Sequence, residues 1–76
     1  MNDYSVILFH STNNAIWTAK ILKINGIKQK MIAIPRHLSS DCGYCVRILS
    51  SDTNEAENLL ADKNIEYNTI VSIKAS

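Results

Sequence analysis

The order of strand-like and helix-like segments constrains the fold of this 76-residue chain more than any other feature. Strands are predicted where β-branched and aromatic residues form short runs, and helices where a capping residue precedes apolar residues at helical spacing. These rules predict strands over 4–9, 29–34, Tyr44–Leu49 and 66–73, a first helix from Ser11 or Thr12 to Asn25, and a second helix from Asp52 to about Lys63. The resulting order, βαββαβ, predicts a ferredoxin-like α+β fold with one four-stranded antiparallel sheet and two helices on one face.

The composition fits a single small domain that spans residues 1–76. Hydrophobic residues make up 46% of the chain, which has only two glycines and one proline, so a core can form without disulfide bonds. The first residues carry no cationic segment, and their apolar run over 6–9 is too short for a secretory signal or a membrane span. We therefore expect a cytoplasmic protein that does not associate with a membrane.

The charged residues are distributed unevenly along the chain. The net charge of +1 is too small to indicate a nucleic-acid partner. Residues 1–47, however, contain six Lys or Arg and only two Asp, whereas residues 48–76 contain two Lys and five acidic residues. Both cysteines lie in the basic part of the chain, which favours the thiolate over the thiol. The lysines themselves are also consistent with a solvated helix face and a strand edge.

The two cysteines, Cys42 and Cys45, form a Cys-x-x-Cys pair. In thioredoxin-like proteins such a pair follows a strand and opens a helix, whose N-terminus lowers the pKa of the thiol. Here the pair leads into the strand predicted over Tyr44–Leu49, so the spacing fits dithiol chemistry but the context does not. A dithiol–disulfide oxidoreductase that uses both cysteines is therefore an alternative function.

Cys42 is the stronger candidate for a reactive thiol. It lies in a polar loop of the basic part of the chain, and accessible thiols of low pKa occur in such surroundings. The next residue, Gly43, permits a positive φ or the close approach of another molecule. The residues predicted to bind substrate or stabilise charge around Cys42 are Arg36, His37, Ser39, Ser40, Gly43 and Arg47.

Cys45 has two possible roles. Strand alternation places Cys45 and Arg47 on one face of the sheet, and Tyr44, Val46 and Ile48 on the face that packs under the helices. Cys45 is either a resolving thiol that attacks sulfur held by the other cysteine or a small buried residue, since free cysteines are often buried.

The sequence does not support a metal site or a cofactor site. The cysteine pair with His10 and His37 would supply four ligands, but their spacing matches no common zinc signature. Paired carboxylates, a nucleophile elbow and a glycine-rich phosphate loop are also missing from the sequence. We therefore expect neither a bound metal nor a cofactor.

Three segments, FHSTNNAI, NGI and IPRHLSSDCG, resemble those of the selenium/sulfur carrier-like family. The resemblance covers roughly residues 6–73, and its most specific part is Ile34-Pro35-Arg36 followed by Leu38-Ser39-Ser40 and Cys42-Gly43. It implies that Cys42, the family's characteristic cysteine, carries sulfur or selenium as a persulfide or selenosulfide. It further implies donor and acceptor proteins as partners, with Arg36 stabilising the thiolate.

A non-enzymatic interaction domain is a third possible function, and the first helix indicates where a partner could bind. Ala15, Ile16, Ala19 and Leu22 form one apolar stripe on this helix, and Trp17, Ile21 and Ile24 form a second on roughly the opposite side. A helix that lies on a sheet can bury only one of these stripes. We therefore predict that the chain forms a homodimer, or binds its partner, through Trp17, Ile21 and Ile24.

Overall fold

The computed structural model describes residues 3–34 and 43–73. The elements in chain order are β1 (Tyr4–Leu8), α1 (Thr12–Ile24), β2 (Gln29–Ala33), β3 (Tyr44–Leu49), the short 3₁₀ helix η1 (Ser50–Asp52), α2 (Thr53–Asp62) and β4 (Thr69–Ile73). All predicted helices and strands are therefore present. The last strand starts at Thr69, later than predicted. Residues 66–68 lead up to the sheet, where Asn68 N–H donates a hydrogen bond to the Leu8 carbonyl at 2.7 Å.

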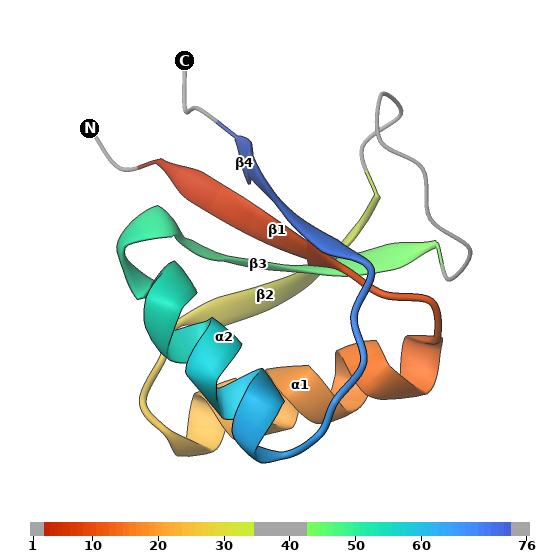
Figure 1. Cartoon of the computed structure of the whole chain (residues 1–76). Helices are drawn as coiled ribbons and strands as arrows, with labels where there is room; N and C mark the ends of the chain where they lie inside the picture. The colour runs from red at the N-terminus through yellow and green to blue at the C-terminus, as the bar shows by residue number, and fades with distance from the viewer. Residues whose placement is uncertain (1–2, 35–42, 74–76) are drawn as a thin grey trace.

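The four strands form one sheet in the order β2-β3-β1-β4, and every neighbouring pair is antiparallel. Figure 1 shows both helices on the same face of this sheet. Each βαβ unit thus has a strand of the other unit between its own two strands, which is the split arrangement of the ferredoxin-like fold. The predicted fold class is confirmed.

Both helices end in the same hydrogen-bonded motif, so the two halves resemble each other locally. After α1, Gly26 N–H donates to the Lys23 carbonyl and Ile27 N–H to the Leu22 carbonyl. After α2, the donors are Asn64 and Ile65 and the acceptors are the carbonyls of Ala61 and Leu60. This is the Schellman motif, in which the residue after the helix adopts a positive φ: 76° at Gly26 and 55° at Asn64. The isoleucine that follows each motif is buried in the core, which fixes the direction in which the chain returns to the sheet.

The two faces of the sheet carry different residues. On the face toward the helices, Ile7, Val46 and Ile48 join the main core with apolar residues of α1 and α2. On the other face, Val6, Leu8 and Cys45 form a second buried cluster, flanked by partly buried aliphatic residues of β2 and β4. The predicted alternation along β3 is confirmed for Val46 and Ile48 on the helix side and for Cys45 on the opposite face.

The apolar stripes of α1 differ from the prediction. The buried residues of this helix are Ala15, Thr18, Ile21 and Leu22. Ile21 is 8% exposed and belongs to the main core, so its predicted place in an outward stripe is wrong, as is the predicted burial of Ile16. The reason is that Thr18, a polar residue, lies at the centre of the buried stripe, one helical turn from Ile21. Trp17 and Ile24 do face outward, at 48% and 82% exposure.

Candidate functional site

The predicted site includes three residues that the structure describes, namely Gly43, Cys45 and Arg47. The other predicted site residues, Arg36, His37, Ser39, Ser40 and Cys42, lie outside the described residues. Their roles therefore stay predictions. The described residues on either side of this segment show where β2 ends and where β3 begins.

Gly43 fixes the point at which the chain rejoins the sheet after Cys42. Its carbonyl accepts a hydrogen bond from Ile34 N–H at 3.2 Å, which continues the β2–β3 ladder one step beyond the Ala33–Tyr44 pair. Its φ is +79°, a conformation that glycine adopts without strain. A side chain at this exposed position would meet no atom within 4 Å, so backbone conformation rather than lack of space accounts for the glycine.

Cys45 lies two residues further along β3 and has no accessible surface. Its register partners are Leu8 on β1 and Ile32 on β2, and it belongs to the buried cluster on the sheet face away from the helices. A buried cysteine in an apolar cluster is inert toward solvent reagents, so Cys45 is a poor nucleophile in this position.

Arg47 lies on the same face as Cys45, but its side chain contacts a different part of the protein. Its guanidinium carbon lies 4.5 Å from the centroid of the Tyr4 ring, which is a cation–π contact. Along the extended strand, Arg47 is about 13 Å from Gly43 at 3.3 Å per residue. The described geometry therefore associates Arg47 with β1 rather than with the chain at Gly43.

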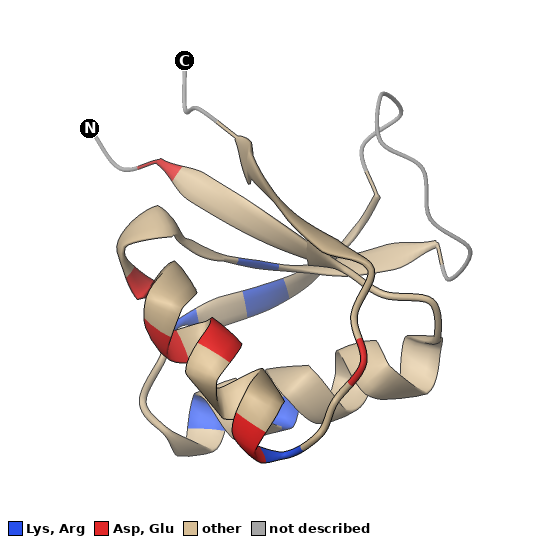
Figure 2. Cartoon of the chain, in the orientation of Figure 1, with Lys and Arg blue, Asp and Glu red and all other residues tan. Residues whose placement is uncertain are grey.

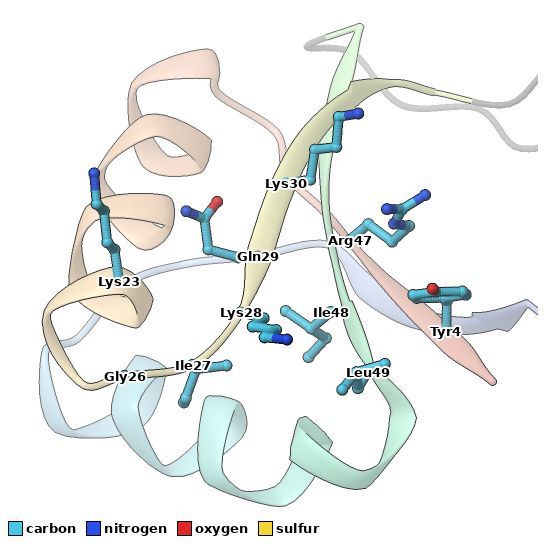
Figure 3. Close-up of a pocket in the computed structure, with 10 residues that line it drawn as sticks. All are labelled: Tyr4, Lys23, Gly26, Ile27, Lys28, Gln29, Lys30, Arg47, Ile48 and Leu49. Atoms are coloured by element: carbon cyan, nitrogen blue, oxygen red, sulfur yellow. The ribbon is translucent and has the colours of Figure 1, made fainter. Parts of the chain in front are cut away.

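Arg47 instead lines a pocket of about 640 Å³ at the other end of β2 and β3 (Figure 3). Its lining residues are Tyr4, Lys23, Gly26, Ile27, Lys28, Gln29, Lys30, Arg47, Ile48 and Leu49. Sequence reasoning attributed the lysines to solvated surfaces and missed this pocket. The available signal was the spacing of Lys28 and Lys30, because residues two apart in a strand share one face.

The described residues give no support for a metal site or a membrane-spanning segment. Within residues 3–34 and 43–73, no group of three or more His, Cys, Asp or Glu side chains could hold a metal ion. Among the same residues, no helix combines the length and apolar character needed to cross a membrane.

The sheet order and the βαββαβ connection define an α+β protein of the ferredoxin-like class, with a cysteine pair where the chain enters β3. Residues 3–72 match the model of the family described as Putative Se/S carrier protein-like, and the chain belongs to this family. No curated protein and no solved structure matched the chain significantly. The family resemblance predicted from the sequence is thus confirmed over nearly the whole chain.

Proposed function

We propose that the protein carries sulfur or selenium on Cys42, as a persulfide or selenosulfide, and relays it from a donor protein to an acceptor protein. Family membership over residues 3–72 carries this proposal. Cys42 lies within the matched range and directly precedes Gly43, the residue at which the exposed end of the β2–β3 ladder begins.

The transfer that we propose is a thiol exchange without net oxidation. The Cys42 thiolate attacks the terminal sulfur of a persulfide on the donor. A sulfur–sulfur bond forms at Cys42, the corresponding bond of the donor breaks, and the donor leaves as a thiolate. An acceptor thiolate then attacks the terminal sulfur on Cys42 in the same manner, which regenerates the Cys42 thiolate. Selenium would follow the same exchange.

The burial of Cys45 supports a carrier over a dithiol oxidoreductase. A second accessible thiol beside a persulfide would attack it, close a disulfide and release sulfide. Cys45 has no accessible surface and packs with Val6 and Leu8. An attack by Cys45 would require this part of the central strand to open, so burial favours a carrier that retains its sulfur.

The charge that stabilises the Cys42 thiolate is assigned in this proposal to Arg36 rather than Arg47. Arg36 follows Pro35, whose fixed φ limits the positions of the next residue, and both precede the thiol by a few residues. Arg47 has an alternative partner in the Tyr4 ring. His37, Ser39 and Ser40 supply further hydrogen-bond donors, since each precedes Cys42 in the same segment.

We also propose that the outward face of α1 is the surface through which two copies of the chain associate. Trp17 and Ile24 are large apolar residues on this face and lie about two turns apart, with Ile16 next to Trp17. Sedimentation velocity at micromolar concentration tests this: Trp17→Glu should lower the sedimentation coefficient, and Asn58→Glu, an exposed change on α2, should not. Equal behaviour of the native chain and Trp17→Glu would contradict the dimer.

The proposed compartment is the cytoplasm. A persulfide carrier needs a cysteine that stays in the thiol state between transfers. Reducing compartments keep thiols in this state.

Intact-mass measurement after incubation with a cysteine desulfurase and cysteine tests the proposed function. The native chain and Cys45→Ala should each gain the mass of one sulfur atom, whereas Cys42→Ser should gain nothing. Loss of two hydrogens that requires both cysteines would instead indicate the dithiol oxidoreductase. An unchanged mass in all three proteins would indicate a domain in which neither thiol reacts.

A further inference from the structure

The pocket at the start of β2 is lined by four cationic side chains and by no carboxylate. Lys23 comes from the last turn of α1, Lys28 and Lys30 from β2 and the turn before it, and Arg47 from β3. Figure 3 shows Lys30, Arg47 and Tyr4 following one another across β2, β3 and β1. A volume of about 640 Å³ is in the range of sites that bind small molecules, which span roughly 300–1,000 Å³.

Two of these cations face each other directly in the sheet. Lys30 and Arg47 are register partners in the antiparallel β2–β3 pair, so their side chains leave the sheet on the same face. Like charges at directly opposite positions destabilise a strand pair. An anion placed between the two side chains would convert this repulsion into two attractive contacts.

These cations have no carboxylate partner among the described residues. Within residues 3–34 and 43–73, Lys23, Lys28, Lys30 and Arg47 form no ion pair with an Asp or Glu side chain. Figure 2 shows most of the acidic residues on α2 and its preceding turn, with Asp3 before β1 and Glu66 before β4, whereas the described cations other than Lys63 lie on α1, β2, β3 and the turn before β2. Lys23 has an independent reason for its position, because a cation at a helix C-terminus is favourable. Arg47 has a partner in the Tyr4 ring, but the placement of Lys28 and Lys30 beside it has no such explanation.

The pocket also has an apolar part. Tyr4 and Leu49, both partly buried, are register partners on the sheet face that carries Lys30 and Arg47, whereas Ile27 and Ile48 line the pocket from the main core on the helix side. Cations next to apolar surface on one face of the sheet suit a small organic or inorganic anion.

We propose that Lys28, Lys30 and Arg47 bind a small anion that carries two linked phosphate groups, with Lys23 at the edge of the site. Two phosphate groups match several cations spaced across two strands, and Arg binds phosphate through two parallel hydrogen bonds. Either an inorganic diphosphate or a nucleoside diphosphate presents this chemistry. The site is separate from the proposed sulfur relay, because it lies at the opposite end of β3 from Gly43.

Calorimetric titration at low ionic strength with pyrophosphate and with ADP tests the proposal. At least one of the two should bind, and the affinity should fall as salt is added. Tighter binding of ADP would assign the apolar part of the pocket to a nucleoside, and equal binding would assign the site to an inorganic anion.

Matched charge-removing variants separate a specific site from a general electrostatic effect. Lys30→Gln and Arg47→Gln should each weaken binding about tenfold or more, as expected for the loss of one contact to a charged group. Lys20→Gln removes the same charge from the exposed surface of α1 outside the pocket, and should leave the affinity within about twofold. Circular dichroism establishes that each variant is folded. Absence of binding to both probes, or an equal loss in Lys20→Gln, would overturn the proposal.

Discussion

Cys45 should be among the slowest thiols to react in the folded protein, and the structure sets the scale. Its side chain has no accessible surface, and β3 lies between β2 and β1, so a reagent reaches the thiol only when the sheet opens. Small domains unfold with a free energy of at least about 5 kcal/mol. Each 1.4 kcal/mol is a factor of ten, so opening should slow the reaction by about three to four orders of magnitude.

The measurement uses Cys42→Ser, in which Cys45 is the only thiol. Mass spectrometry follows its modification by a maleimide in buffer and in guanidinium chloride, where the chain is unfolded. A free cysteine in a peptide serves as the control for reagent activity in each solvent. Modification in buffer within about tenfold of the unfolded rate would refute the buried position of Cys45 and the argument that it spares a persulfide on Cys42.

Three further predictions concern the fold and the thiol. Gly26→Ala should lower the free energy of unfolding by about 1 kcal/mol in denaturant titrations, because alanine is strained at a φ of +76°. The cost should stay this small because the added Cβ meets no atom within 4 Å, and no change would contradict the strain argument. Thr18→Val should leave that free energy unchanged or raise it by about 1 kcal/mol, since the buried Thr18 hydroxyl has no hydrogen-bond partner in the described structure, and a loss above about 1 kcal/mol would indicate a partner. Arg36→Ala should raise the pKa of the Cys42 thiol, followed by thiolate absorbance in Cys45→Ala, and an unchanged pKa would leave Arg36 without an electrostatic role there.

The sequence was sufficient to predict the elements and the sheet faces because local rules and tertiary packing agree there. These local rules used the β-branched runs, Gly26 after the first helix and the alternation along Tyr44–Leu49. Each of these signals depends on residues that are close together in the sequence. Ile21 was placed on the wrong side of α1 because the buried stripe contains Thr18 at its centre. Tertiary contacts determine whether a polar residue packs against a sheet, and the periodicity of the sequence carries no information about these contacts.

The basic pocket could not be predicted for a related reason. Lys23, Lys30 and Arg47 are far apart in the sequence, and only the β2–β3 register and the return of the chain after α1 bring them together. Arg47 was assigned to the surroundings of Cys42 by its nearness in sequence. Along a strand, however, a few residues correspond to a distance larger than a charge-assisted contact.

Cyanolysis of the loaded protein tests the central claim most directly. The protein is incubated with a cysteine desulfurase and cysteine, separated from both, and treated with cyanide. Cyanide attacks the terminal sulfur of a persulfide, leaves with it as thiocyanate and restores the cysteine thiolate. A carrier with its sulfur on Cys42 should release about one thiocyanate per chain from the native protein and from Cys45→Ala, and none from Cys42→Ser, as one thiolate holds one transferable sulfur. Thiocyanate from Cys42→Ser at the native level, or none from the native protein, would contradict sulfur carriage on Cys42.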